Sequence, residues 1–179
     1  MFVIVLSAVL APFILTGAVV TSVSIVAGSS SSSGDAPGGA VTVSGDWAIP
    51  LSSYSFTSGY GPRECEGCSK FHEGVDLASS CGDVVHSASS GVVISAGPYQ
   101  RYGNTVRIDH GGGVSTLYAH MMWDSQRVKA GQTVEAGTPL GFEGNTGQSH
   151  GCHVHFEVRL NGAPVNPAPF MAARGLPLV

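Results

Sequence analysis

The chain has 179 residues, of which only 11% are charged and 25 are glycines, and its net charge is −4 at pH 7. This length accommodates one domain of ordinary size plus an extension. Abundant glycine and β-branched residues with few charges favour an all-β domain over a helical one. The chain has no basic stripe, so we expect no nucleic-acid partner.

The N-terminal segment is hydrophobic and uncharged. Residues 1–28 contain no Lys, Arg, Asp or Glu, and the first charged residue is Asp35. Since a helix needs about 20 apolar residues to span a bilayer, the segment predicts one hydrophobic helix that serves as a membrane anchor. A long export signal is the alternative. Both interpretations place the rest of the chain in the cell envelope, either membrane-anchored and extracytoplasmic or secreted after cleavage.

A linker and a single domain follow. The run "SSSSSGDAPGG" has the Ser/Gly/Pro composition of a flexible tether, and we assign residues 29–46 to it. The globular domain is therefore predicted over residues 47–179.

Alternation of apolar and polar residues in this domain is typical of short strands joined by tight turns. No long helical periodicity occurs after residue 47, so we expect antiparallel sheets. The last residues, 170–179, are expected to form a loose tail or one helical turn. The predicted strand segments are a hairpin over 106–120 that turns at "HGGG", short strands over 128–141, and a strand over 153–160 that returns after Asn161-Gly162.

Four cysteines occur, at Cys65, Cys68, Cys81 and Cys152. In an exported chain cysteines favour disulfides, and adjacency suggests the pairs Cys65–Cys68 and Cys81–Cys152. The alternative is a structural zinc site with four cysteine ligands, seeded by the C-x-x-C spacing.

Three histidines fall within six residues in "HGCHVHFEV". On a strand, His153 and His155 share one face, about 6–7 Å apart, while Val154 and Phe156 point to the core. The pair therefore belongs either to one polar site or to a half-exposed surface. His150 is interpreted as a rim residue.

A second polar element is "FHEGVD". In a straight strand His72 and Asp76 lie about 13 Å apart, too far to share a metal ion. Gly74 allows a bend or a single helical turn that brings them together. The segment is not the H-E-x-x-H helix of metalloproteases, because Asp76 replaces the second histidine and glycine disfavours the helix. Glu73 is accordingly interpreted as a flanking residue.

Together these residues have the composition of a catalytic zinc site. Such a site takes three protein ligands from histidine nitrogen and carboxylate oxygen, and keeps one position open. His72, Asp76 and one histidine of the His153/His155 pair supply that set. The other histidine and His120, in "LYAHM", can accept the proton of a water molecule and stabilise an oxyanion. The spacing does not decide which member of the pair binds the metal.

These motifs resemble those of the lysostaphin/LytM-type zinc metallopeptidases, which cut peptide bridges in bacterial peptidoglycan. The resemblance covers about residues 57–170. It rests on "HEGVD" (72–76), "GNTVRIDHGGGVSTLYAHM" (103–121), "VKAGQTVEAGTPLG" (128–141), "GNTGQSHGCHVHFEV" (144–158) and "NP" (166–167). It implies a lysostaphin-like fold, one Zn²⁺ held by His72, Asp76 and His155, and a catalytic pair formed by His120 and His153.

The implied activity is hydrolysis of peptide crosslinks or bridges of peptidoglycan by metal-activated water. Arg63 and Asn145 are possible groove residues, and packing is the alternative role for Arg63. Cys152 stands where the family has proline. A Cys81–Cys152 disulfide could brace the strand that carries His153 and His155. The alternative is that Cys152 lies close to the metal ion.

Three other functions have some support in the sequence. A non-catalytic wall-binding or activating module is disfavoured because all five site residues are present. A biotinyl or lipoyl carrier is disfavoured because "MMWDS" has no lysine and Lys129 lies outside that context. A wall-remodelling component of an envelope secretion or conjugation apparatus remains compatible with enzymatic activity. The expected partners are peptidoglycan peptides, and the membrane through the N-terminal segment.

Overall fold

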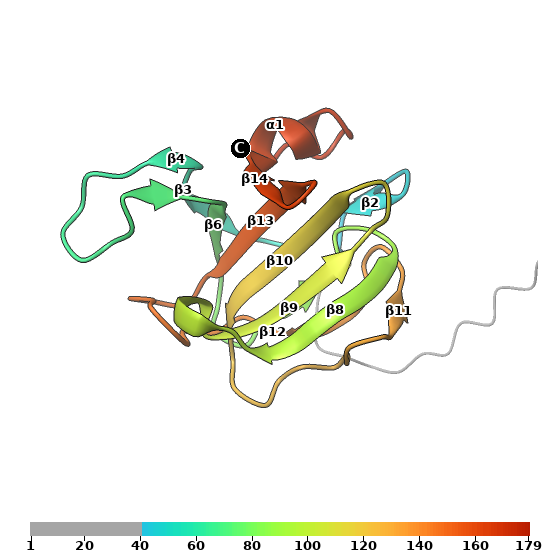
Figure 1. Cartoon of the computed structure of the whole chain (residues 1–179), viewed down its shortest axis with the longest axis horizontal. Coiled ribbons are helices and arrows are strands. Elements are labelled where there is room, and N and C mark those ends of the chain that lie inside the picture. Colours follow the sequence, from blue (N-terminus) through green and yellow to red (C-terminus); the bar gives the residue numbers. More distant parts are fainter. Residues whose placement is uncertain (1–40) are drawn as a thin grey trace, which may run out of the picture. The chain divides into compact units, whose positions relative to one another are not determined.

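The computed structural model describes residues 41–179 (Figure 1). The predicted hydrophobic segment 1–28 and residues 29–40 of the predicted linker lie outside the described residues. Within the described part, no helix has the length and hydrophobicity that a membrane crossing requires.

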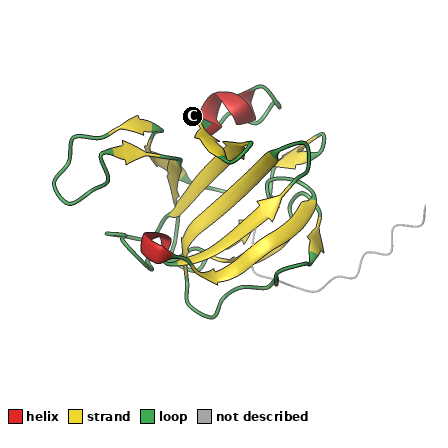
Figure 2. Ribbon diagram, viewed as in Figure 1, coloured by secondary structure: helices red, strands yellow, loops and turns green. Residues whose placement is uncertain are grey.

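Antiparallel strands make up most of the regular secondary structure of the described residues (Figure 2). The largest sheet has eight strands in the order β11-β8-β9-β10-β13-β6-β3, with β14 paired to β13. This arrangement confirms the predicted antiparallel β architecture. The strands of this sheet are β3 (Ser55–Ser58), β6 (Val75–Ala78), β8 (Gly91–Pro98), β9 (Asn104–Asp109), β10 (Val114–Met121), β11 (Thr133–Val134), β13 (Val154–Leu160) and β14 (Ala163–Val165).

Three two-stranded pairs accompany the large sheet: β1 (Val43–Ser44) with β2 (Trp47–Ala48), β4 (Gly61–Pro62) with β5 (Phe71–His72), and β7 (Val84–His86) with β12 (Pro139–Phe142). The β4–β5 hairpin extends beyond the large sheet and carries the loop 63–70 (Figure 1).

Both hairpins predicted from the sequence are present. Strands β9 and β10 pair across the 110–113 turn, where three consecutive glycines adopt positive φ. Strands β13 and β14 pair across Asn161 and Gly162, whose φ angles of 50° and 84° are those of a tight hairpin turn.

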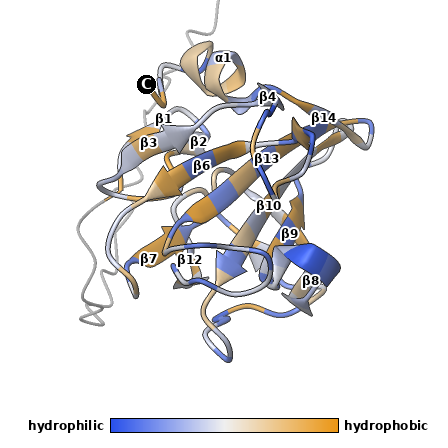
Figure 3. Cartoon of the chain, turned by 90° about the vertical axis from the view of Figure 1, so that its left-hand side faces the viewer, coloured by the Kyte–Doolittle hydropathy of each residue, from blue (hydrophilic) through white to orange (hydrophobic). Residues whose placement is uncertain are grey.

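The hydrophobic core packs against the central strands of the large sheet. Val154, Phe156 and Val158 alternate along β13 and are fully buried, as the sequence pattern predicted for the first two. Figure 3 shows this hydrophobic banding on β13 and its neighbour β6. Tyr118 on β10 is also buried, and its hydroxyl accepts a hydrogen bond from the Ala88 amide at 2.6 Å. Burial of each large apolar side chain contributes about 1.5–3 kcal/mol.

The C-terminal residues form a short helix and a buried segment, and not a loose tail. Helix α1 (Pro167–Ala172) begins after Asn166, whose side chain accepts a hydrogen bond from the Ala168 amide. Beyond the helix, Leu176 and Leu178 are buried in the core. Because α1 and the short 3₁₀ turn η1 (Gln100–Tyr102) are also present, the all-β prediction is corrected to a mostly β fold.

Candidate metal centre

A bend between β5 and β6 brings His72 and Asp76 together. His72 is the last residue of β5, Asp76 lies in β6, and Glu73 and Gly74 form the bend. A Cβ atom at Gly74 would lie 2.4 Å from the Phe156 carbonyl oxygen and 2.9 Å from His155 Cε1. Glycine is therefore required because β13 passes so close, and the geometry is a bend rather than a helical turn.

Strand pairing supplies the third residue. Strand β13 runs beside β6, and His155 is the direct partner of Asp76 although 79 positions separate them. His72 Nε2 and His155 Nδ1 are 2.8 Å apart, and each lies 3.0 Å from Asp76 Oδ1. We call His72, Asp76 and His155 the donor triad.

The donor triad fits a zinc ion. In a tetrahedral zinc site with ligand bonds of 2.0–2.2 Å, neighbouring donor atoms lie about 3.3 Å apart. The three observed separations are shorter by only a few tenths of an ångström. The other ring nitrogens have partners, since His72 Nδ1 donates to the Gly59 carbonyl at 2.7 Å and His155 Nε2 donates to Glu157 Oε1 at 3.0 Å. These bonds leave His72 Nε2 and His155 Nδ1 as the lone-pair donors.

Asp76 is held as a carboxylate. Burial raises its pKa, but the adjacent His155 and His72 side chains outweigh burial and hold the pKa well below its usual range. Its second oxygen, Oδ2, accepts a hydrogen bond from Arg63 Nη2 at 2.6 Å. The structure therefore places Arg63, a possible groove residue, on the carboxylate of the donor triad.

A buried hydrogen-bond network behind His155 is not among the features predicted from the sequence. The Glu157 side chain is fully buried and accepts hydrogen bonds from His155, Tyr102 and Arg159. Arg159 and Tyr102 also contact Glu73, which stays outside the donor triad. Glu157 follows His155 by two positions, so the period of a strand was the signal that could have found it.

His120 and His153 face each other beside the donor triad, with ring centroids 4.7 Å apart. A bulge in β10 gives His120 a φ of 60°, an uncommon conformation for a residue other than glycine. His120 Nδ1 donates to the Thr146 carbonyl at 2.8 Å, and His153 Nδ1 donates to the Gly151 carbonyl at 2.9 Å. Both Nε2 atoms therefore remain available, and that of His153 lies 3.7 Å from Asp76 Oδ1.

His120 is neutral at physiological pH. Burial lowers its pKa to about 4, although the Thr146 hydrogen bond acts in the opposite direction and the neighbouring His153 adds to the decrease. With Nδ1 carrying the proton, Nε2 of the neutral ring can accept another.

Two disulfides flank the site. The structure pairs Cys65 with Cys68 and Cys81 with Cys152, the pairing that adjacency suggested, and the described residues contain no free cysteine. A site with four cysteine ligands is thereby excluded, and Cys152 has no thiolate to offer a metal. The second bridge ties the segment before β13 to the loop after β6.

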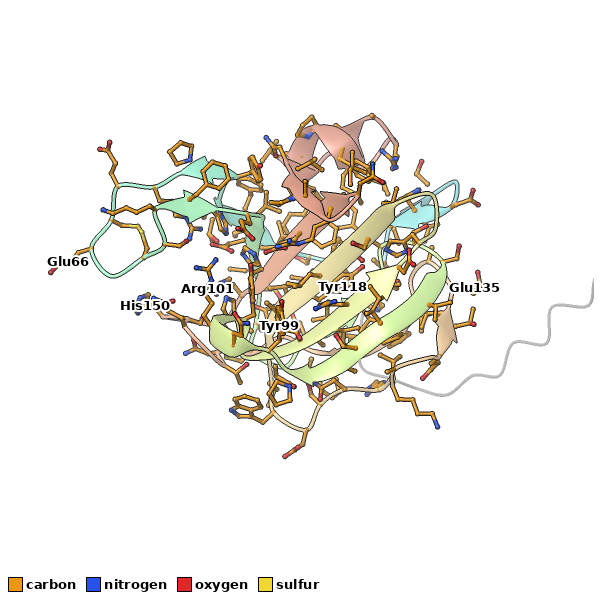
Figure 4. All side chains as sticks on the ribbon, in the orientation of Figure 1. Glu66, Tyr99, Arg101, Tyr118, Glu135 and His150 are labelled. Atoms are coloured by element: carbon orange, nitrogen blue, oxygen red, sulfur yellow. A yellow bond between two sulfur atoms is a disulfide. The ribbon has the colours of Figure 1, made fainter. Side chains whose placement is uncertain are left out.

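The donor triad opens into a cleft of about 370 Å³. Residues of its walls include His120, His153, Arg101 and the rim residue His150. Asn145, predicted as a possible groove residue, is exposed but does not line the cleft. In the view of Figure 4, Arg101 and His150 lie between the sheet and the loop that carries Glu66.

A His-Asp-His donor set with two further histidines at its open side is the arrangement of a metallohydrolase. Residues 70–167 match the family model described as "Peptidase family M23". The catalytic domain of lysostaphin from Staphylococcus simulans superposes with a TM-score of 0.60 at 32% identity, over 66% of this chain and 92% of that domain. The chain belongs to peptidase family M23 and has a lysostaphin-like fold.

Curated relatives agree with this membership. The chain is 45% identical over 98 residues to the DD-carboxypeptidase/endopeptidase Mpg of Neisseria meningitidis serogroup B, covering 55% of this chain and 22% of that protein. It is 36% identical over 118 residues to the peptidoglycan DD-endopeptidase ShyA of Vibrio cholerae, covering 64% and 27% respectively. The chain thus spans about a quarter of the length of these relatives.

Proposed function

We propose that the protein is a zinc-dependent endopeptidase that hydrolyses peptide crosslinks of bacterial peptidoglycan. The observation that carries this proposal is the convergence of three donor atoms to within 3.0 Å of one another, next to two histidines with free Nε2 atoms. The two curated relatives, a DD-carboxypeptidase/endopeptidase and a peptidoglycan DD-endopeptidase, support a crosslink between D-amino acids as the substrate.

In this mechanism the donor triad binds Zn²⁺ and the two other histidines handle protons. Zinc held there would supply Lewis-acid polarisation of the scissile carbonyl and would activate water as a nucleophile near neutral pH. His120, neutral and with Nδ1 fixed by Thr146, accepts a proton at Nε2. His153, with Nδ1 fixed by Gly151, presents Nε2 to the cleft, and with a proton on both ring nitrogens it would donate a hydrogen bond from Nε2 to the developing oxyanion.

We further propose that residues 41–179, which include the paired strand β1, form the peptidase domain, that residues 29–40 are a tether, and that residues 1–28 anchor it to the membrane. The uncharged N-terminal run and the two disulfides support an extracytoplasmic, membrane-tethered location. A role in wall opening for an envelope secretion or conjugation apparatus is compatible with this location.

The test measures zinc content and lysis of purified sacculi together. His72→Ala and His155→Ala should lose both, because each removes one of three metal ligands. His153→Ala should keep zinc and lose lysis. His150→Ala is the matched control, since it removes an exposed cleft histidine that offers no donor to the triad, and it should keep zinc.

Chelation should abolish lysis and added zinc should restore it. Mass spectrometry of the released muropeptides then identifies the bond that is cut. Chelator-resistant lysis, or a zinc-free His153→Ala protein, would contradict the assignment of metal ligands. A protein that binds zinc but releases no muropeptide would favour the alternative of a wall-binding or activating module.

A further inference from the structure

One charged side chain in the cleft has no ionic partner. Arg63 pairs with Asp76, and Glu73 pairs with Arg159. Arg101 also lines the cleft, but no acidic side chain of residues 41–179 forms a salt bridge with it. Its side chain is exposed, and its guanidinium carbon lies 5.5 Å from the centroid of the Tyr102 ring.

The backbone that carries Arg101 is held firmly. Arg101 is the middle residue of η1, and its carbonyl oxygen accepts a hydrogen bond from the Gln148 amide at 2.8 Å. A Cβ atom at Gly103 would lie 2.5 Å from Thr146, so the turn packs directly against the 146–148 segment. Because the backbone at Arg101 is already ordered, binding of an anion to its side chain costs less entropy than on a mobile loop.

The same segment positions a catalytic histidine. The Thr146 carbonyl accepts a hydrogen bond from His120 Nδ1. Two residues further, the Gln148 amide donates a hydrogen bond to the Arg101 carbonyl. The Tyr102 ring also connects the two regions, since its centroid is 5.6 Å from that of His155. Arg101 is therefore linked to the donor triad through two successive side-chain contacts. A bound peptide in extended conformation, with about 3.3 Å per residue, can span this distance with a few residues.

A guanidinium that lines a peptide-binding cleft and lacks an internal partner is suited to a carboxylate, which it can bind through two parallel hydrogen bonds. We propose that Arg101 forms a carboxylate-binding subsite, through which the enzyme selects stem peptides that carry a free carboxylate within a few residues of the scissile bond. This inference rests on the proposed function, because it names a feature of the substrate of the same cleft.

The experiment compares one synthetic pair of crosslinked stem peptides in two forms, with free carboxylates and with the same carboxylates amidated. The wild-type full-length chain should cleave the free acid about tenfold more efficiently, mainly through a lower KM, as expected for one exposed charge-assisted contact. Arg101→Gln should lose this preference, and Arg101→Lys should keep part of it. Zinc content should stay unchanged in both variants.

Arg127→Gln is the matched control. It removes one positive charge outside the cleft, where Arg127 stacks on Phe142, and should retain the wild-type preference. Equal cleavage of the two peptides by the wild type, or an unchanged preference in Arg101→Gln, would overturn the subsite.

Binding of the two peptides to zinc-loaded His153→Ala protein, measured by calorimetry, tests the subsite without turnover. The free acid should bind about tenfold more tightly, and the additional change Arg101→Gln should remove the difference. Absence of hydrolysis by the wild type would contradict the proposed function. Equal binding of acid and amide in this assay would contradict the subsite.

Discussion

Replacement of the buried Glu157 by glutamine should weaken zinc binding although Glu157 does not contact the metal position. In the native chain all three neighbours donate hydrogen bonds to its carboxylate: His155 Nε2 at 3.0 Å, the Tyr102 hydroxyl at 2.7 Å and Arg159 Nε at 2.6 Å. A glutamine has the same shape, but its NH₂ group can accept no hydrogen bond.

Each orientation of the new amide therefore has a cost. If its oxygen faces Arg159, the NH₂ group faces His155 Nε2 and favours the tautomer with the proton on Nδ1, the atom that must bind zinc. If its oxygen faces His155, the NH₂ group faces Arg159 and the buried ion pair is lost. Changes to carboxylates that orient metal-binding histidines weaken affinity about 10- to 100-fold, or about 1.4–2.8 kcal/mol.

Competition with a chromophoric chelator measures this affinity, and circular dichroism with thermal melting confirms that the variant folds. Glu143→Gln is the matched control, because Glu143 is also fully buried and hydrogen-bonded, to Ser79 rather than to a ligand of the triad. A folded Glu157→Gln protein with wild-type zinc affinity would refute the reasoning. An equal loss of affinity in Glu143→Gln would show that any buried glutamate produces the effect.

Two further predictions concern the framework of the site. Gly74→Ala should destabilise the fold by about 1–3 kcal/mol and weaken zinc binding, because the added methyl overlaps the Phe156 carbonyl and the His155 ring. Urea unfolding and zinc titration measure the two effects. An unchanged free energy of unfolding together with an unchanged zinc affinity would contradict the prediction. The double change Cys81→Ser/Cys152→Ser should lower the free energy of unfolding by up to about 4 kcal/mol, since the bridge closes a loop of 71 positions. Denaturant unfolding measures the change. If removal of the short Cys65–Cys68 bridge costs as much stability, the loop-length argument is contradicted.

Local sequence patterns were sufficient for much of the fold. Alternation predicted that Val154 and Phe156 enter the core, and the Asn161-Gly162 pair predicted the β13–β14 turn. Both signals are local, because side-chain direction on a strand and turn type depend on a few adjacent residues. The C-terminal residues were harder to predict, since burial of Leu176 and Leu178 depends on a surface built by distant strands.

For the site, the sequence by itself supplied the residue types: two histidines and an aspartate suited to zinc, two more histidines for proton transfer, and cysteines suited to disulfides. It could not determine which histidine of the His153/His155 pair belongs to the metal position, and the family resemblance was needed for that choice. Only the tertiary structure set His155 opposite Asp76, placed Arg63 and Glu157 on the ligands, and turned Arg101 into the cleft. The physical reason is that a metal centre depends on distances between atoms of remote segments, and strand pairing, which fixes those distances, depends on the whole sheet.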